Sequence, residues 1–85
     1  MESTALIGFF AGLLSTAAFL PQAWQIWSSR RAKDVSQPTY VVLIVAGVLW
    51  IMHGISNEDP ALIVTNTIIV LVSFGILAMK KYFDR

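Results

Sequence analysis

Three long apolar runs occupy most of this chain and constrain what it can fold into. They cover residues 5–27, 38–55 and 60–79, with short polar segments between them. As a helix, the first run would reach about 34 Å, which is enough to cross a hydrocarbon core of roughly 30 Å. We therefore expect an all-α membrane protein in which residues 1–85 form a single unit of three transmembrane helices, with spans close to these limits.

The composition excludes several classes of function. Hydrophobic residues make up 56% of the chain and charged residues 13%, against about 25% charged residues in a soluble domain. The chain has no cysteine and His53 is its only histidine, so it lacks the ligands of a thiolate or histidine metal site. A net charge of +1 gives no basic face for nucleic acid. We expect no metal, no cofactor and no nucleic-acid partner, and the absence of a nucleophile and base pair predicts that the protein is not an enzyme.

The basic residues predict the orientation of the spans. All six lysines and arginines lie in the first connector, residues 28–37, or in the C-terminal segment, residues 80–85, whereas the second connector carries Glu58 and Asp59. Positive charge stays on the cytoplasmic side during insertion, and with three spans the first connector and the C-terminus share a side. We therefore expect a multi-pass protein with its N-terminus outside and its C-terminus in the cytoplasm.

A proline inside the first apolar run marks a place where that helix can bend. Pro21 and Gln22 have apolar residues on both sides, and no turn residues follow them. Membrane helices tolerate proline because neighbouring helices, hydroxyl groups or water can satisfy the carbonyl that the missing N–H leaves free. We interpret Pro21 as a kink within the first span.

Two side chains of the later spans are candidates for binding a solute. Trp50 comes five residues before the end of the second span and Asn66 six residues after the start of the third, so they lie about 8 and 9 Å below the outer surface. An indole offers a flat apolar platform to a sugar, and an amide both donates and accepts hydrogen bonds. Trp50 also fits an interfacial anchor or a packed ring, and Asn66 a hydrogen bond between helices. Neither residue alone identifies a substrate.

Small residues recur every fourth position on the first span, at Gly8, Gly12 and Thr16. Such a stripe lets helix backbones approach closely in a membrane, where lipid gives no hydrophobic drive to associate. The stripe fits packing of the first helix within its own bundle and packing between two copies equally well.

Ionisable groups are almost absent from the spans. No Asp or Glu lies inside any of them, and His53, near the end of the second, is the only ionisable side chain deep enough to be called intramembrane. His53 also fits a water-accessible histidine at the interface. Carriers driven by protons usually keep a carboxylate or histidine relay at membrane depth, so the pattern favours passive, uncoupled movement of a solute.

Taken together, these residues resemble the SemiSWEET bacterial sugar transporters, the single-unit relatives of SWEETs within the PQ-loop superfamily. The landmarks are the Pro21-Gln22 pair, residues 34–36 of the basic connector, Leu49-Trp50 and Asn66. The resemblance covers essentially the whole chain. It implies a three-helix bundle with the third helix packed between the first and the second, and a parallel homodimer that gives a 3+3 transporter.

The resemblance also implies roles for particular residues. Trp50 and Asn66 of both protomers would line a central sugar pocket. Pro21 and Gln22 would form the hinge that lets the inner end of the first helix swing, and Pro38 would help to close the inner gate.

An outer gate is implied at three positions of this sequence. His53 stands where the family often has a tyrosine, and Asn57 and Asp59 stand where it often pairs an arginine with an aspartate. Asp59 therefore matches the family pattern, whereas His53 and Asn57 depart from it. Because histidine changes charge between about pH 5 and 8, the departure affects both the strength and the pH response of such a gate.

The function implied by the resemblance is sugar uniport in the bacterial inner membrane. A homodimer surrounded by lipid would move a mono- or disaccharide by facilitated diffusion, alternating its access between the two sides. Two alternatives remain open at this point: a PQ-loop carrier of another small solute such as an amino acid, and a non-transporting small membrane subunit.

Overall fold

The chain folds into helices that run side by side along one long axis. The computed structural model describes residues 3–84 and contains α1 (Ser3–Ala17), α2 (Phe19–Ser29), α3 (Gln37–Ser56) and α4 (Pro60–Phe83). The first two are halves of one span, so three helical stretches, Thr4–Ser29, Gln37–Ser56 and Pro60–Phe83, are long and apolar enough to cross a membrane. The expected class, an all-α bundle of three apolar helices, is confirmed.

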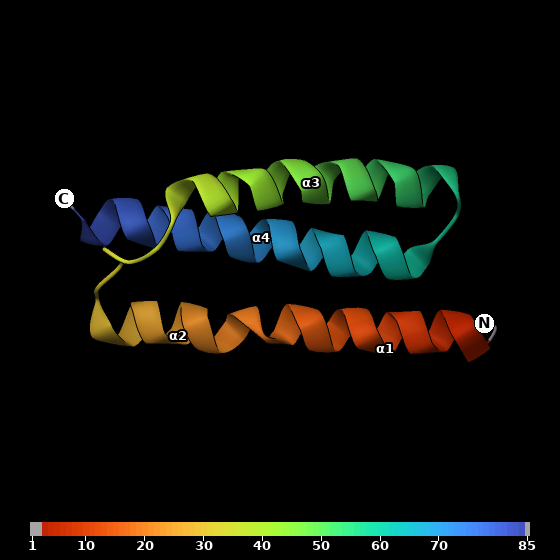
Figure 1. Ribbon diagram of the computed structural model, residues 1–85, viewed down its shortest axis with the longest axis horizontal. Coiled ribbons are helices and arrows are strands. Elements are labelled where there is room, and N and C mark those ends of the chain that lie inside the picture. The colour runs from red at the N-terminus through yellow and green to blue at the C-terminus, as the bar shows by residue number, and fades with distance from the viewer. Residues whose placement is uncertain (1–2, 85) are drawn as a thin grey trace.

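The third span lies between the other two, as expected. Figure 1 shows α4 in the middle of the bundle, with α3 on one side and α1 followed by α2 on the other. The N-terminus and the α3–α4 turn lie at one end, which we call the turn end. The C-terminus and the α2–α3 connector lie at the opposite end, which we call the connector end.

Capping residues explain where α3 and α4 begin. Ser36 precedes α3 and its Oγ accepts a hydrogen bond from the Thr39 N–H, while Pro38 occupies the first turn. Asp59 precedes α4 and its Oδ1 accepts from the N–H groups of the first turn, with Pro60 opening the helix. Proline suits a first turn because its missing N–H has no partner there in any helix. At its other end α4 continues beyond residue 79 to Phe83.

The first span is interrupted three residues before Pro21. Ala18 separates α1 from α2, and Pro21 is the third residue of α2. A proline ring clashes with the carbonyl four residues earlier, so the irregularity falls in the preceding turn, before the proline itself. Ala18 keeps helical angles, φ −63° and ψ −23°. The two halves consequently follow each other nearly end to end in Figure 1.

Glycines bring α1 and α3 close to α4. A Cβ placed on Gly12 would lie 2.5 Å from Thr65 Cγ2, and one placed on Gly47 would lie 2.5 Å from Val70 Cγ2. A Cβ placed on Gly8 would have no atom of another residue's side chain or of a neighbouring helix within 4 Å. The small-residue stripe of the first span is therefore divided: Gly12 packs within the bundle, and Gly8 lies open.

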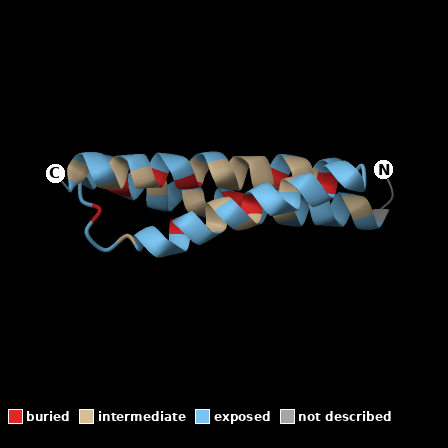
Figure 2. Ribbon diagram, turned by 90° about the horizontal axis from the view of Figure 1, so that it is seen from above, coloured by how far each residue is buried: buried red, intermediate tan, exposed pale blue. Residues whose placement is uncertain are grey.

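Most large apolar side chains remain exposed on the single chain. In Figure 2 the buried residues are scattered red segments on helices that are otherwise tan or pale blue. Among the residues whose burial the structure describes, those that are apolar and buried lie in the half of the bundle nearer the connector: Ile26, Ala32, Tyr40 and Ile76. An unpartnered bundle of this kind completes its packing with lipid or with other helices.

Candidate functional site

Trp50 presents an exposed indole beside the face of α3 that packs on α4. Its side chain is 51% exposed, and its ring meets that of His53 edge to face with the ring centres 5.7 Å apart. Positions three apart in a helix are neighbours on its surface, which explains the pairing. Gly47, one turn earlier, is buried against α4. The indole therefore stands at the margin of the α3–α4 contact.

Asn66 of α4 is half-buried, and its side-chain amide makes only part of the hydrogen bonds that it could make. Its Nδ2 donates to the Leu62 carbonyl at 2.9 Å, and within residues 3–84 its Oδ1 accepts no hydrogen bond. An amide can make up to four hydrogen bonds, two as donor and two as acceptor. The side chain thus retains capacity for a polar ligand.

The α3–α4 packing places Trp50 and Asn66 at one level of the bundle. Gly54 lies against Leu62 and Ile63, while Gly47 lies against the Asn66 carbonyl and Val70. The two helices run in opposite directions. Trp50 lies between Gly47 and Gly54 on α3. Asn66 lies on the facing part of α4, next to Gly47. Both residues therefore belong to the same short section of the α3–α4 contact.

Trp50 and Asn66 lie apart from the cavities described at the connector end. Two cavities lie at the connector end, and neither Trp50 nor Asn66 lines them. One protomer therefore offers these two side chains on an open surface.

The outer-gate candidates fall into two separate groups at the turn end. Asn57 Nδ2 donates to the His53 carbonyl at 2.8 Å and lies 3.4 Å from both nitrogens of the His53 ring. Asp59 Oδ1 instead accepts from the N–H groups of Ala61 and Leu62, at 3.1 and 3.3 Å. The structure brings His53 and Asn57 together, whereas Asp59 acts as the cap of α4.

The hinge candidates lie in the connector half of the first span. Gln22 Oε1 accepts a hydrogen bond from the hydroxyl of Tyr40 on α3. Tyr40 is 5% exposed, and a buried tyrosine hydroxyl usually finds such a partner. Gln22 thereby joins α2 to α3, directly after Pro21. Pro38, the inner-gate candidate, is exposed in the first turn of α3.

Lys80 is a further connecting residue at this end, one that the sequence interpretation assigned only to a basic tail. Its Nζ donates to the Ala32 carbonyl at 3.0 Å and pairs with Asp84 Oδ2 at 2.9 Å. Ala32 is 1% exposed. Lys80 therefore fastens the connector to the last turn of α4, and the only sequence signal for it was a lysine near the end of a long helix.

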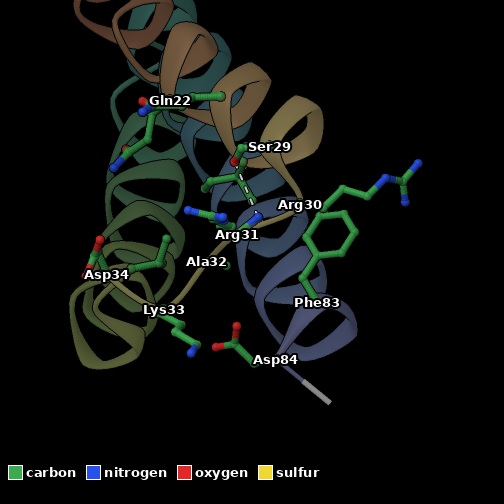
Figure 3. A pocket seen from close by; sticks show the side chains of 12 residues that line it. Gln22, Ser29, Arg30, Arg31, Ala32, Lys33, Asp34, Phe83 and Asp84 are labelled. Atoms are coloured by element: carbon green, nitrogen blue, oxygen red, sulfur yellow. Dashed lines mark hydrogen bonds between the residues drawn. The ribbon is translucent and has the colours of Figure 1, made fainter.

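The larger cavity has a volume of about 690 Å³ and lies beneath the connector, between α2 and the end of α4. Figure 3 shows basic, acidic and amide side chains around it, among them Gln22, Arg31, Lys33 and Asp34. Its lining is thus polar, unlike the open surface around Trp50.

Comparison with known proteins shows where the chain belongs. Residues 4–83 match the family described as "Sugar efflux transporter for intercellular exchange". The "Sugar transporter SemiSWEET" of Bradyrhizobium diazoefficiens is 36% identical over 75 residues, covering 88% of this chain and 87% of that protein. The protein of the same name from Leptospira biflexa is 32% identical, covering 88% of each chain.

Solved structures agree with the sequence matches. One described as a bacterial homologue of SWEET transporters superposes with a TM-score of 0.92 at 30% identity, covering 96% of this chain and 99% of the other. A SemiSWEET in the inward-open conformation gives a TM-score of 0.84 at 25% identity, covering 95% and 94%. Sequence and fold agree over nearly the full length, and the chain belongs to the SemiSWEET family.

Proposed function

We propose that two copies of this chain form a parallel homodimer that carries a mono- or disaccharide across the bacterial inner membrane. The single observation that carries the proposal is the likeness, over 88% of the chain, to relatives named as sugar transporters. The geometry supports it, because Trp50 and Asn66 share one level of the bundle and the Trp50 side chain is 51% exposed there. A second protomer would supply the opposite wall.

The open face of the single chain supports the dimer. Three helices cannot enclose a pathway wide enough for a sugar, and many large apolar side chains remain exposed. Gly8, with nothing within 4 Å of its Cβ position, leaves room for a close helix contact. Two-fold symmetry then gives a pocket with two indoles and two amides.

Such a pocket would bind sugar weakly, as a carrier requires. A dissociation constant of 1 mM corresponds to about 4 kcal/mol. Two stacked rings at roughly 0.5 to 1.5 kcal/mol each, together with a few hydrogen bonds, reach that value. Tighter binding would slow release on the far side.

The break at Ala18 supports alternating access. In the proposed cycle α2 swings against α1 at the turn before Pro21, and the Gln22–Tyr40 hydrogen bond opens or moves with it. Pro38 narrows the inner mouth, and His53, Asn57 and Asp59 lie at the outer one. Because residues 3–84 place no Asp or Glu deep within a span, we propose uniport without proton coupling. The basic connector puts the connector end in the cytoplasm and the N-terminus outside.

Counterflow in proteoliposomes tests this function. Purified protein alone should accumulate radiolabelled glucose or sucrose, with or without an imposed pH gradient. Trp50→Ala and Asn66→Ala should abolish the accumulation while leaving the dimer intact. Trp24→Ala is the matched control, because Trp24 is also an exposed indole but lies on α2. No counterflow from dimeric wild-type protein would refute the proposal, and unchanged counterflow in Trp50→Ala would refute the pocket.

A further inference from the structure

Arg31 extends into the cavity at the connector end without a carboxylate partner. Figure 3 shows Arg30 and Arg31 extending in opposite directions, Arg31 toward the side where Asp34 lies and Arg30 outward past Phe83. Within residues 3–84 the one side-chain ion pair joins Lys80 and Asp84. No carboxylate oxygen of these residues therefore lies within 4 Å of the side-chain nitrogens of Arg31 or Lys33. A guanidinium in a polar cavity is thus left free to bind an anion.

The other charges of the cavity are largely engaged elsewhere. Arg30 also lines the cavity, but its guanidinium is held over two aromatic rings, with the guanidinium carbon 5.5 Å from the Trp27 ring centre and 5.6 Å from that of Phe83. Asp84 is neutralised by Lys80, which leaves Asp34 as the one acidic group of the lining without an ion pair among the described residues. Arg31 and Lys33 together outweigh it. The electrostatic balance of the cavity favours a negatively charged ligand.

Neutral donors complete the site. Ser29 Oγ accepts from the Arg31 N–H at 3.3 Å, so its hydroxyl hydrogen is available to a ligand. The Gln25 amide also lines the cavity and has no side-chain hydrogen bond within residues 3–84. A guanidinium presents its N–H groups as a planar fork that matches the oxygens of a phosphate.

We propose that this cavity binds a phosphate group, with Arg31 as its principal ligand and Lys33 as its second positive charge. The cavity volume of about 690 Å³ accepts a ligand considerably larger than inorganic phosphate. Two sources share this chemistry: the headgroup of an anionic phospholipid, which reaches the cavity from the membrane surface, and a soluble phosphorylated compound. A site of this kind is distinct from the proposed sugar pocket at Trp50 and Asn66.

Binding measurements on the full-length protein distinguish the two sources. In detergent, calorimetric titration with inorganic phosphate and with glucose 6-phosphate tests the soluble source, and glucose is the uncharged control. In nanodiscs, retention of phosphatidylglycerol against phosphatidylcholine tests the lipid source. Saturable binding from either source supports the proposal and identifies that source.

Matched variants test the assignment to Arg31. Losing a bidentate charged hydrogen bond should weaken binding by about tenfold or more in Arg31→Gln. Arg30→Gln removes the same charge from the neighbouring position and should change binding by less than about twofold, since that guanidinium points away. Equal losses in both variants would mean nonspecific attraction to the basic connector and would overturn the site.

Two further outcomes are decisive. In wild-type protein with ¹⁵N-labelled arginine, the Arg31 Nε–H signal should shift on titration while that of Arg30 moves less, which settles the matter even if a variant folds poorly. No saturable binding from either source up to about 10 mM, the range in which a single contact of this kind is measurable, would overturn the proposal. Because these experiments measure binding alone, their result does not depend on whether the protein transports sugar.

Discussion

The two ends of the bundle are held together by different kinds of contact. At the turn end the side-chain hydrogen bonds among residues 3–84 are local. They run from Asn57 to His53 and from the first turn of α4 to Asp59, and none of them spans more than four residues. They fix the ends of individual helices. They do not tie one helix to another beyond what the chain connection already does.

At the connector end the bonds join segments far apart in the sequence. Tyr40 donates to Gln22 across 18 residues, and Lys80 donates to the Ala32 carbonyl across 48. The buried apolar residues cluster there as well. The comparison shows that the side-chain hydrogen bonds cap individual helices at one end and join separate segments at the other. In the proposed cycle, opening the connector end therefore requires specific bonds to break.

The largest effect on transport is expected where the two halves of the first span meet. Pro21→Ala would restore an N–H to the turn that contains Ala18 and straighten the junction of α1 and α2. We expect a folded dimer whose counterflow is slower by about tenfold, or about 1.4 kcal/mol in the barrier. Pro60→Ala, in the first turn of α4, is the control and should transport normally. A normal rate in Pro21→Ala would mean that the break serves packing only.

Lys80→Met should loosen the connector end alone. The substitution keeps the length of the side chain but removes the hydrogen bond to Ala32 and the ion pair with Asp84. We expect a loss of about 1 to 2 kcal/mol in the free energy of unfolding, allowing for partial exposure, and faster hydrogen exchange across residues 30–36. Lys81→Met is the control, since Lys81 is an exposed neighbour. Similar exchange in both variants would contradict the role of Lys80 as a tether.

Asp59→Ala should weaken the turn end by about 1 kcal/mol, because α4 loses the acceptor for two N–H groups of its first turn. Asp59→Asn keeps an acceptor and should cost less. Hydrogen exchange is expected to rise around residues 57–62 and to stay unchanged in the connector. Loss of protection at both ends would show that the two are more strongly coupled than their contacts indicate.

Tyr40→Phe should have the smallest effect, about 0.5 to 1 kcal/mol, because Gln22 is exposed and can bind water instead. A double-mutant cycle with Gln22→Ala isolates the contact: the two unfolding free energies should not add. Spin labels on α2 and α3 should report a broader distance distribution at the connector end. Fully additive effects would exclude a direct bond between the two side chains in the folded protein.

Hydropathy was sufficient to predict the number of spans, because each apolar run is long enough to cross a bilayer and is bounded by polar residues or proline. The order of the helices followed from the family resemblance. The sequence analysis placed the bend at Pro21, whereas the break lies at Ala18, because the ring of a proline clashes with the turn before it. The pair Asp59-Pro60 is typical of the start of a helix, and Asp59 does cap α4. The family resemblance had instead implied a place for Asp59 in an outer gate.

The tertiary contacts of the connector end were beyond sequence reasoning. Gln22 and Tyr40 lie in different spans, and no periodicity relates them. The sequence assigned Arg31 and Lys80 only a role in the orientation of the spans. Their contacts depend on how the connector packs against the end of α4, which the sequence does not reveal. The depths of Trp50 and Asn66 in the membrane were easier to predict, because the rise per residue of a helix gives the depth once the ends of the span are known. Their roles remain proposals.

The central place of α4 has a consequence for how the protein is made. In Figure 1 the first span and α3 lie on opposite sides of α4, which leaves the ribosome after both of them. The first two spans therefore have little to pack against until Pro60–Phe83 enters the membrane. During synthesis they must wait in lipid as separate helices, and a nascent chain halted before residue 60 would expose both to membrane quality control.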